Sequence, residues 1–108
     1  MAFTVRTYTQ PGVTGLDPTI YVLEDSGGHQ AEVWPALGFN CFRWVVPHGG
    51  QLLDLLYADP NLFGNGRPTR SGIPVLFPFP NRIRAGRFTC DGNEYTLPLN
   101  DHTQKHAT

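Results

Sequence analysis

An asparagine and an arginine, Asn81 and Arg82, stand next to each other at the end of a proline-rich segment of the chain. The carboxamide of asparagine donates and accepts hydrogen bonds, and the guanidinium of arginine donates several in a fixed planar geometry. Such a pair suits a ligand that carries hydroxyl or anionic oxygens, because guanidinium N–H groups bond to both. Asn81 and Arg82 are therefore the first candidates for ligand contacts.

The segment that carries this pair has a stiff backbone. Pro78 and Pro80 fix φ and lack an N–H, so they belong at a sheet edge or in a rigid extended stretch. A side chain on such a backbone loses little conformational entropy on binding. We expect buried rings of Phe77 and Phe79 to anchor the segment, so that the pair is held on a rigid support.

The stretch around the pair is strongly positive. Residues 67–87 hold five arginines and no aspartate or glutamate, in a chain whose formal net charge is -1. This asymmetry favours an anionic or polyhydroxylated ligand without choosing between them. The alternative is that the arginines are solvated or ion-paired surface residues. They are Arg67, Arg70, Arg82, Arg84 and Arg87.

Other residues that could carry chemistry are weaker candidates. His102 and His106 stand four apart and, with Cys90, would supply three zinc ligands, but no CxxC motif or second pair completes the set. We therefore expect solvated loop histidines. Ser26 and Ser71 lie in no nucleophile elbow. Several aromatic side chains could stack on a sugar face, although core packing is the commoner role for tryptophan in a strand: Trp34, Trp44, Tyr57 and Phe63.

Length and composition limit the class of protein. The 108 residues suffice for one domain, and a pI near 6.4 argues against a general binder of nucleic acid or anionic membranes. No apolar stretch approaches the ~20 residues of a membrane span, and residues 1–6 lack a signal-peptide pattern, so we expect a soluble cytoplasmic protein. Cys41 and Cys90 lie in alternating apolar stretches, which predicts two small buried side chains.

Short apolar runs separated by turn residues predict an all-β chain of antiparallel strands. Alternation of apolar and polar residues predicts strands over residues 3–9, 19–24, 30–34 and 39–46. Residues 51–58 also match helical spacing, but the stretch available is short for a helix, and we expect a strand. The segment that follows, up to Arg70, is rich in glycine, proline and asparagine and predicts a loop.

The clearest local signal is a hairpin around residues 91–92, an Asp-Gly pair that tolerates the positive φ of a type I′ turn. A two-residue loop there sets Phe88 opposite Tyr95 and Thr89 opposite Glu94. The hairpin would then carry aromatic rings on one face and polar groups on the other.

The sequence of this region resembles the aldose 1-epimerase (galactose mutarotase) family. Residues 72–83 read GIPVLFPFPNRI and are followed by GRF at 86–88, DG at 91–92, EY at 94–95 and LP at 97–98. Upstream, residues 31–38 read AEVWPALG and look like the family's early strand and glycine turn. The resemblance is loose from about residue 20 and close from residue 72 to residue 100.

The resemblance implies a large antiparallel β-sandwich of the galactose mutarotase type, of which residues 1–108 would form the N-terminal part of a single domain. It also implies that the whole protein interconverts the α and β anomers of an aldohexose. A base takes the proton of the anomeric hydroxyl, a histidine protonates the ring oxygen, and the opened ring recloses on either face. No metal or organic cofactor is expected, because two positioned side chains suffice for the proton transfers.

The family's Asn-Arg pair matches Asn81 and Arg82 and contacts the sugar. A His-Gly segment follows shortly afterwards in the family, and His106, just before it, is a further candidate for a substrate contact. The catalytic histidine and glutamate of the family are expected downstream of Thr108, so no catalytic residue is assigned within the chain. We expect this segment alone to be inactive and marginally stable, with open strand edges and half a core.

Two other functions stay open. One is a hexose-phosphate mutarotase in which Arg67, Arg70 or Arg84 meets the phosphate. The other is a non-catalytic carbohydrate-binding domain that keeps the sugar cleft and lacks the acid-base pair. In each case the partner is a small sugar rather than a nucleic acid or a membrane.

Overall fold

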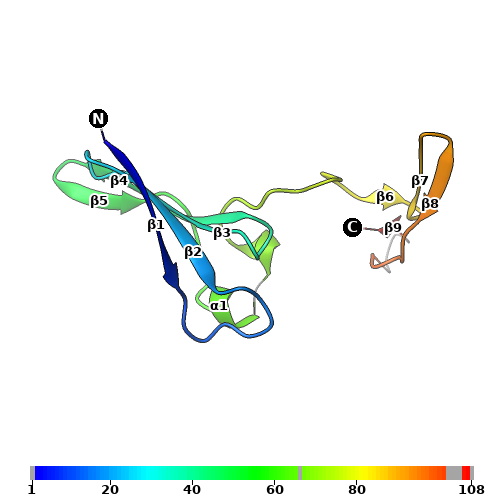
Figure 1. Ribbon diagram of the computed structural model, residues 1–108, viewed down its shortest axis with the longest axis horizontal. Helices are drawn as coiled ribbons and strands as arrows, with labels where there is room; N and C mark the ends of the chain where they lie inside the picture. Colours follow the sequence, from blue (N-terminus) through cyan, green and yellow to red (C-terminus); the bar gives the residue numbers. More distant parts are fainter. Residues whose placement is uncertain (1, 66, 102–105, 108) are drawn as a thin grey trace. The chain divides into compact units, whose positions relative to one another are not determined.

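A computed structural model describes residues 2–65, 67–101 and 106–107, and the chain divides into two compact units, Met1–Val75 and Leu76–Thr108. The first unit is built on an antiparallel sheet of five strands that neighbour one another in chain order (Figure 1). All the paired strands are antiparallel, which confirms the predicted all-β class. The five strands are β1 (Phe3–Thr9), β2 (Thr19–Asp25), β3 (Gln30–Trp34), β4 (Asn40–His48) and β5 (Gln51–Asp54).

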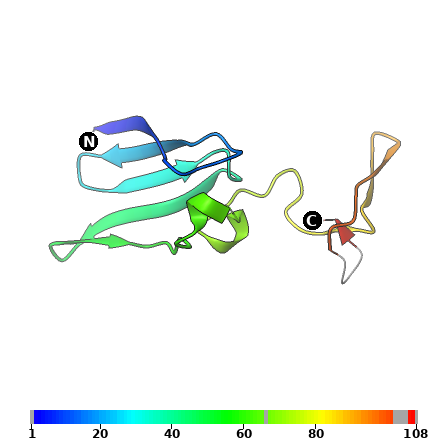
Figure 2. The same ribbon diagram turned by 90° about the horizontal axis from the view of Figure 1, so that it is seen from below.

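Turns built from the expected residue types join these strands, which lie side by side in Figure 2. Between β2 and β3, the carboxylate of Asp25 accepts hydrogen bonds from the backbone N–H groups of Gly27 at 2.8 Å and His29 at 3.0 Å. Between β4 and β5, Gly49 and Gly50 have φ values of 57° and 77°. Glycine adopts this left-handed conformation without the steric cost that a β-carbon would bring.

The region after β5 differs from the prediction. The strand ends at Asp54 rather than near residue 58, because its carboxylate accepts a hydrogen bond from the backbone N–H of Leu56 at 3.2 Å and turns the chain. The following loop contains two short helical turns, α1 (Leu62–Asn65) and η1 (Pro68–Arg70). Within the described residues, no helix has the length and apolar character needed to cross a lipid bilayer.

One face of the five-stranded sheet carries the core. Ile20 and Val22 are fully buried, whereas their neighbours Tyr21 and Leu23 are 41% and 45% exposed. This is expected because successive side chains of a strand point to opposite faces of the sheet. Leu62 of α1 covers the buried face at one end. Phe63 adds ring contacts to Trp34 and Phe42, with ring centroids 5.4 Å apart in each pair. The core cluster comprises Ile20, Trp34, Leu37, Phe42 and Leu62.

The opposite face of the sheet exposes apolar side chains. Alternate positions on β1, β2 and β4 present large apolar groups that no other described segment of the first unit covers. Trp44 is 45% exposed on this face, so the expectation that both tryptophans pack in a core holds for Trp34 alone. The prediction of two buried cysteines is wrong, since Cys90 is exposed and Cys41 is half-buried. An alternating pattern predicts a strand but not whether a second layer covers each face.

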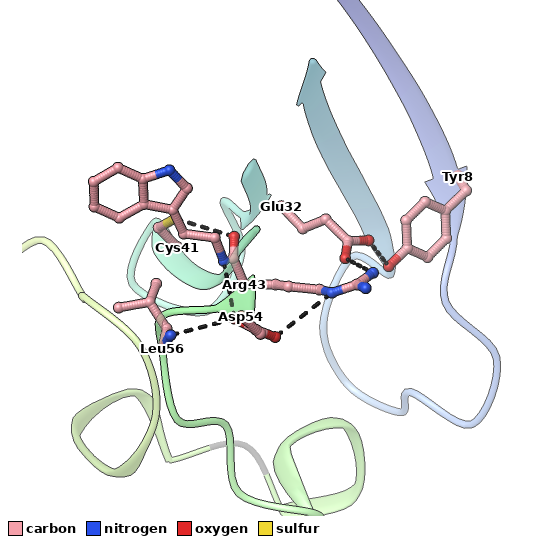
Figure 3. A network of polar contacts seen from close by, with 7 residues as sticks. Tyr8, Glu32, Cys41, Arg43, Asp54 and Leu56 are labelled. Carbon is pink, nitrogen blue, oxygen red and sulfur yellow. Dashed lines mark hydrogen bonds and ion pairs between the residues drawn. The ribbon is translucent and has the colours of Figure 1, made fainter. Parts of the chain in front are cut away.

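A polar network lies on the core side of the sheet, which the sequence did not reveal (Figure 3). The carboxylate of Glu32, only 6% exposed, accepts a hydrogen bond from the Tyr8 hydroxyl at 2.7 Å and one from Arg43 Nη1 at 3.0 Å. Asp54 lies 3.6 Å from the Nε of Arg43. The network links β1, β3, β4 and β5, and it satisfies a carboxylate whose burial without partners would be costly.

At Gly72, where the chain leaves the sheet, its backbone lies in close contact with β4. Gly72 has φ +55°, and a β-carbon there would lie 2.2 Å from the carbonyl oxygen of Cys41 and 2.7 Å from Cα of Phe42. Next to it, Ile73 exchanges two backbone hydrogen bonds with Cys41, at 3.0 and 3.2 Å. Residues 72–75 therefore continue the first unit as a short pairing partner of β4.

The second unit consists of two small antiparallel pairs, β6 (Ile83–Arg84) with β9 (His106–Ala107) and β7 (Arg87–Cys90) with β8 (Asn93–Thr96). The predicted hairpin is confirmed, with Phe88 opposite Tyr95 and Thr89 opposite Glu94. Asp91 and Gly92 have φ values of 51° and 77°, as a type I′ turn requires.

Replacing Gly72 by alanine should destabilise the first unit more than the same change at Gly49. Both glycines have a left-handed backbone, with φ +55° at Gly72 and +57° at Gly49, but a β-carbon at Gly49 would meet nothing within 4 Å. Gly49→Ala should cost about 1 kcal/mol for the left-handed backbone alone, and Gly72→Ala should add ~1–3 kcal/mol for the steric conflict with β4. Denaturant unfolding of both variants measures the difference. Equal losses would contradict the close contact.

High pH should weaken the first unit as Tyr8 ionises. Burial, followed by the hydrogen bond to Glu32 and the charge of that carboxylate, raises the pKa of Tyr8 to about 12 from 10.0. The stabilisation is therefore complete below pH 10.0 and is lost as the pH rises through about 12. Because Tyr8 is partly solvated, we expect a loss of ~1 kcal/mol rather than the full value of the shift.

The measurement is the unfolding free energy on both sides of this pH window, for the native chain and for Tyr8→Phe. The phenylalanine variant has no hydroxyl at this position, so the difference between the two proteins isolates Tyr8 from the other tyrosines. The same pH dependence in both would show that Tyr8 contributes nothing.

The open apolar face should make the chain self-associate. Val5 and Leu23 lie opposite each other on this face and are 65% and 45% exposed, so replacing both by threonine keeps the strand propensity and removes apolar area from water. Light scattering should show less aggregate for the double variant. Ile20→Thr on the buried face is the control, and it should increase aggregation by unfolding the core. Unchanged aggregation of the double variant would contradict this role of the face.

Candidate functional site

The predicted ligand-binding pair lies immediately before β6 in the second unit. Both side chains are exposed to solvent. The Asn81 side-chain oxygen accepts a hydrogen bond from the backbone N–H of Arg82 at 2.7 Å. This local bond is typical of asparagine in turns and fixes the orientation of its carboxamide. Among the described residues, none is shown to accept a hydrogen bond from the Nδ2 group of Asn81.

The guanidinium of Arg82 is held by a carboxylate far along the chain. Its Nε donates to Asp101 Oδ2 at 2.6 Å, and the Asp101 side chain is only 14% exposed, against 52% for Arg82. No described residue accepts a hydrogen bond from the Nη groups of Arg82. The ion pair therefore orients the guanidinium while its outer donors stay available to a ligand.

Backbone pairing brings the third predicted residue close to this pair. In the β6–β9 ladder, Arg84 lies opposite His106, two residues after Arg82 in the chain. The side chain of His106 lies outside the described part of the structure, as does His102, the other member of the weak zinc candidate. The sequence offered no signal for this pairing, because β6 and β9 are short and separated by the whole hairpin.

A tight turn sets the direction in which the chain leaves the pair. Ala85 and Gly86, between β6 and β7, both have positive φ, 52° and 66°. A β-carbon at Gly86 would lie 2.6 Å from the carbonyl oxygen of Leu97, whose N–H donates to the Gly86 carbonyl at 2.7 Å. Glycine is required there because backbone from the far side of the hairpin passes close to it.

One aromatic ring, rather than two, anchors the proline-rich segment. Phe79 packs on Phe88 with ring centroids 4.9 Å apart, and Phe88 stacks on Tyr95 at 5.1 Å. Phe77 is 87% exposed and Phe79 is 37% exposed, so the expectation of buried rings is wrong for both residues. A single two-stranded hairpin offers only one small apolar face, and Phe79 occupies it.

A concavity of about 390 Å³ lies within the second unit, and neither Asn81 nor Arg82 is among the residues that line it. Its walls are mainly apolar, and Asn100 is the polar residue among those that line it. The C–H face of a sugar ring packs against such a surface, while its hydroxyls need donors and acceptors at the edge. Asn81 and Arg82 lie in the chain between two of the lining residues. The lining residues are Phe77, Pro78, Phe79, Ile83, Leu97, Pro98 and Asn100.

The five clustered arginines fall into both units. Arg67 and Arg70 belong to the first unit, and Arg82, Arg84 and Arg87 belong to the second. Of the five, Arg82 alone has an ion pair with a carboxylate among the described residues.

Comparison with known proteins identifies a family and a curated relative. Residues 21–108 match the family model described as Aldose 1-epimerase. The uncharacterized protein YihR of Escherichia coli (strain K12) is 34% identical over 67 residues, which make up 58% of this chain and 22% of YihR. The chain thus spans less than a quarter of the length of this curated relative, and no solved structure matches it. Because the family model extends from β2 to the last residue, through the Asn-Arg pair and the hairpin, the chain belongs to the aldose 1-epimerase family.

Proposed function

We propose that this chain is the N-terminal portion of an aldose 1-epimerase-type mutarotase that interconverts the α and β anomers of a hexose. The observation that carries the proposal is the match to the Aldose 1-epimerase family, which includes the segment with Asn81 and Arg82. The proposal that further chain completes the domain is supported by the 22% share of YihR that is covered and by the uncovered apolar face of the sheet.

In the proposed reaction, a base removes the proton from the anomeric hydroxyl as the bond from C1 to the ring oxygen breaks, and an acid gives the ring oxygen a proton. The open-chain aldehyde rotates about C1–C2 and closes again with either face of the carbonyl. We assign the acid and the base to parts of the whole protein beyond Thr108. Two positioned proton-transfer groups typically accelerate such a reaction by ~100- to 10,000-fold each.

Within this chain, the proposed role is to bind and orient the sugar. The Nη donors of Arg82 and the carboxamide of Asn81 would bond to sugar hydroxyls, and the apolar concavity of the second unit would accept a C–H face of the ring. His106 is a further proposed contact, supported by its backbone position opposite Arg84. Asp101 would act through Arg82, as a positioning residue.

A hexose-phosphate mutarotase is a second candidate function. The arginines of residues 67–87 that have no ion pair among the described residues favour it, because they leave positive charge available to an anion.

A cytoplasmic location is also proposed, and the two free thiols, Cys41 and Cys90, support it.

Arg82→Ala in the whole protein should weaken hexose binding by ~1.5–3 kcal/mol, the usual range for a hydrogen bond to a charged group. Calorimetric titration with glucose measures the change. Arg87→Ala, which removes a charge from the neighbouring strand β7, is the matched control and should leave affinity unchanged.

Asp101→Asn separates the sugar contact from the ion pair. It keeps the guanidinium and loses the charge partner, so its affinity loss should be smaller than that of Arg82→Ala. Unchanged affinity in Arg82→Ala would remove this residue from the sugar site.

Polarimetry on the 108-residue chain alone should show no acceleration of mutarotation, and measurable turnover would place an acid-base pair within it.

A further inference from the structure

The first strand of the five-stranded sheet has a free edge (Figure 2). β1 pairs with β2 along its whole length, from Phe3 opposite Asp25 to Thr9 opposite Thr19, and no other described strand pairs with it. An unpaired edge presents a row of backbone N–H and C=O groups that another chain can pair with. None of the proposed sugar contacts belongs to this unit.

Hydrogen bonds just outside the two ends of β1 show which of its backbone groups point outward. The N–H of Ser26 donates to the carbonyl of Ala2 at 3.0 Å, and the N–H of Gln10 donates to the carbonyl of Pro18 at 2.9 Å. In an antiparallel pair, residues that bond to the partner strand alternate with residues that do not. The even-numbered residues of β1 therefore bond to β2. The N–H and C=O groups that point to the free edge belong to the odd-numbered residues, Phe3, Val5, Thr7 and Thr9.

β1 lacks the features that commonly protect an edge strand. Such strands are often short, or carry a proline, a lysine or a β-bulge. β1 has seven residues, contains no proline or lysine, and keeps one register with β2 throughout. By contrast, β5 at the opposite edge has four residues. The charged residue of β1 is Arg6, and its Nε is held by the Glu24 carboxylate of β2 at 2.6 Å.

The position of this charge selects a register for pairing with a second copy of the chain. Antiparallel pairing centred on Arg6 would set two arginines directly opposite each other, which is unfavourable. Pairing centred on Val5 instead sets Arg6 of one copy opposite Thr4 of the other. Thr4 is the residue of β1 that lies opposite Glu24 in β2, so Arg6 of the second copy approaches a carboxylate.

The apolar side chains favour the same register. Pairing centred on Val5 sets the two valines opposite each other and Phe3 of each copy opposite Thr7 of the other, so the open apolar face continues from one sheet to the next. Both Phe3 and Val5 are well exposed in the single chain, at 75% and 65%. Pairing centred on Thr7 would set Phe3 opposite Pro11, which lies beyond the end of β1.

We propose that two copies of this chain pair edge to edge through β1, antiparallel, with Val5 on the two-fold axis. A two-fold contact of this kind closes on itself, so it yields a dimer rather than a growing aggregate. It uses only the edge of the sheet and leaves both faces available to a second layer in the whole protein. The proposal does not depend on the proposed epimerase activity.

The first experiment is size-exclusion chromatography with light scattering on the 108-residue chain, which should give twice the monomer mass of 12.0 kDa. Thr7→Pro removes an N–H that points outward and keeps the bonds to β2, so it should give a monomer with an unchanged circular dichroism spectrum. Leu23→Thr is the matched control, because it alters the open face and not the edge, and it should stay dimeric. A monomeric native chain, loss of the dimer in Leu23→Thr, or a dimer that persists in Thr7→Pro would overturn the proposal.

Disulfide cross-linking tests the register without a proline. In a background of Cys90→Ser, which removes the exposed thiol, Val5→Cys should form a covalent dimer when oxidised glutathione is added. Residues opposite each other in a hydrogen-bonded pair have Cα atoms ~5.5 Å apart, within the range of a disulfide. Arg6→Cys in the same background should not cross-link, because its two copies would lie more than ~7 Å apart. Equal cross-linking of both variants, cross-linking of neither, or preference for Arg6→Cys would overturn the proposed pairing.

Discussion

The close approach of Gly72 to the first residues of β4 is the constraint on which much of the first unit depends. No β-carbon fits between Gly72 and the carbonyl of Cys41, so the two backbone segments lie in direct contact. Ser71, just before this contact, is buried and bonded to Asp59 and Asn40. Ile73, just after it, pairs with β4. One steric requirement thus fixes the arginine-bearing loop and the start of the proline-rich segment together.

The sheet itself has one buried face and one open face, and the two have different physical consequences. The buried face combines an aromatic and aliphatic cluster with a satisfied polar network, so it forms a core even within this short chain. The open face leaves alternating apolar side chains in water, which costs free energy. An antiparallel sheet with one uncovered apolar face corresponds to one layer of a β-sandwich without the second layer.

The arginines show how the same residue type takes different roles in one fold. Arg43 is paired with Glu32 on the core side, where the ion pair connects strands. Arg82 is paired through its Nε with Asp101, which orients its guanidinium. Arg67 and Arg70 share a cavity without a paired carboxylate among the described residues. The partners, rather than the local charge along the chain, decide which arginine is structural and which is available to a ligand.

Local features of the sequence determined the strands and the hairpin register. They also singled out the Asn-Arg pair as a candidate for ligand contacts. Alternation and turn residues act over a few positions, so β1 to β4 and the Phe88–Tyr95 register could be predicted from them. Tertiary structure alone decided which strand faces are buried and which arginines have partners. It also decided that Phe77 and Cys90 are exposed. Those outcomes depend on contacts such as Arg82 with Asp101, 19 residues apart. A pattern read along the chain cannot contain them, because burial and ion pairing arise only when distant segments pack.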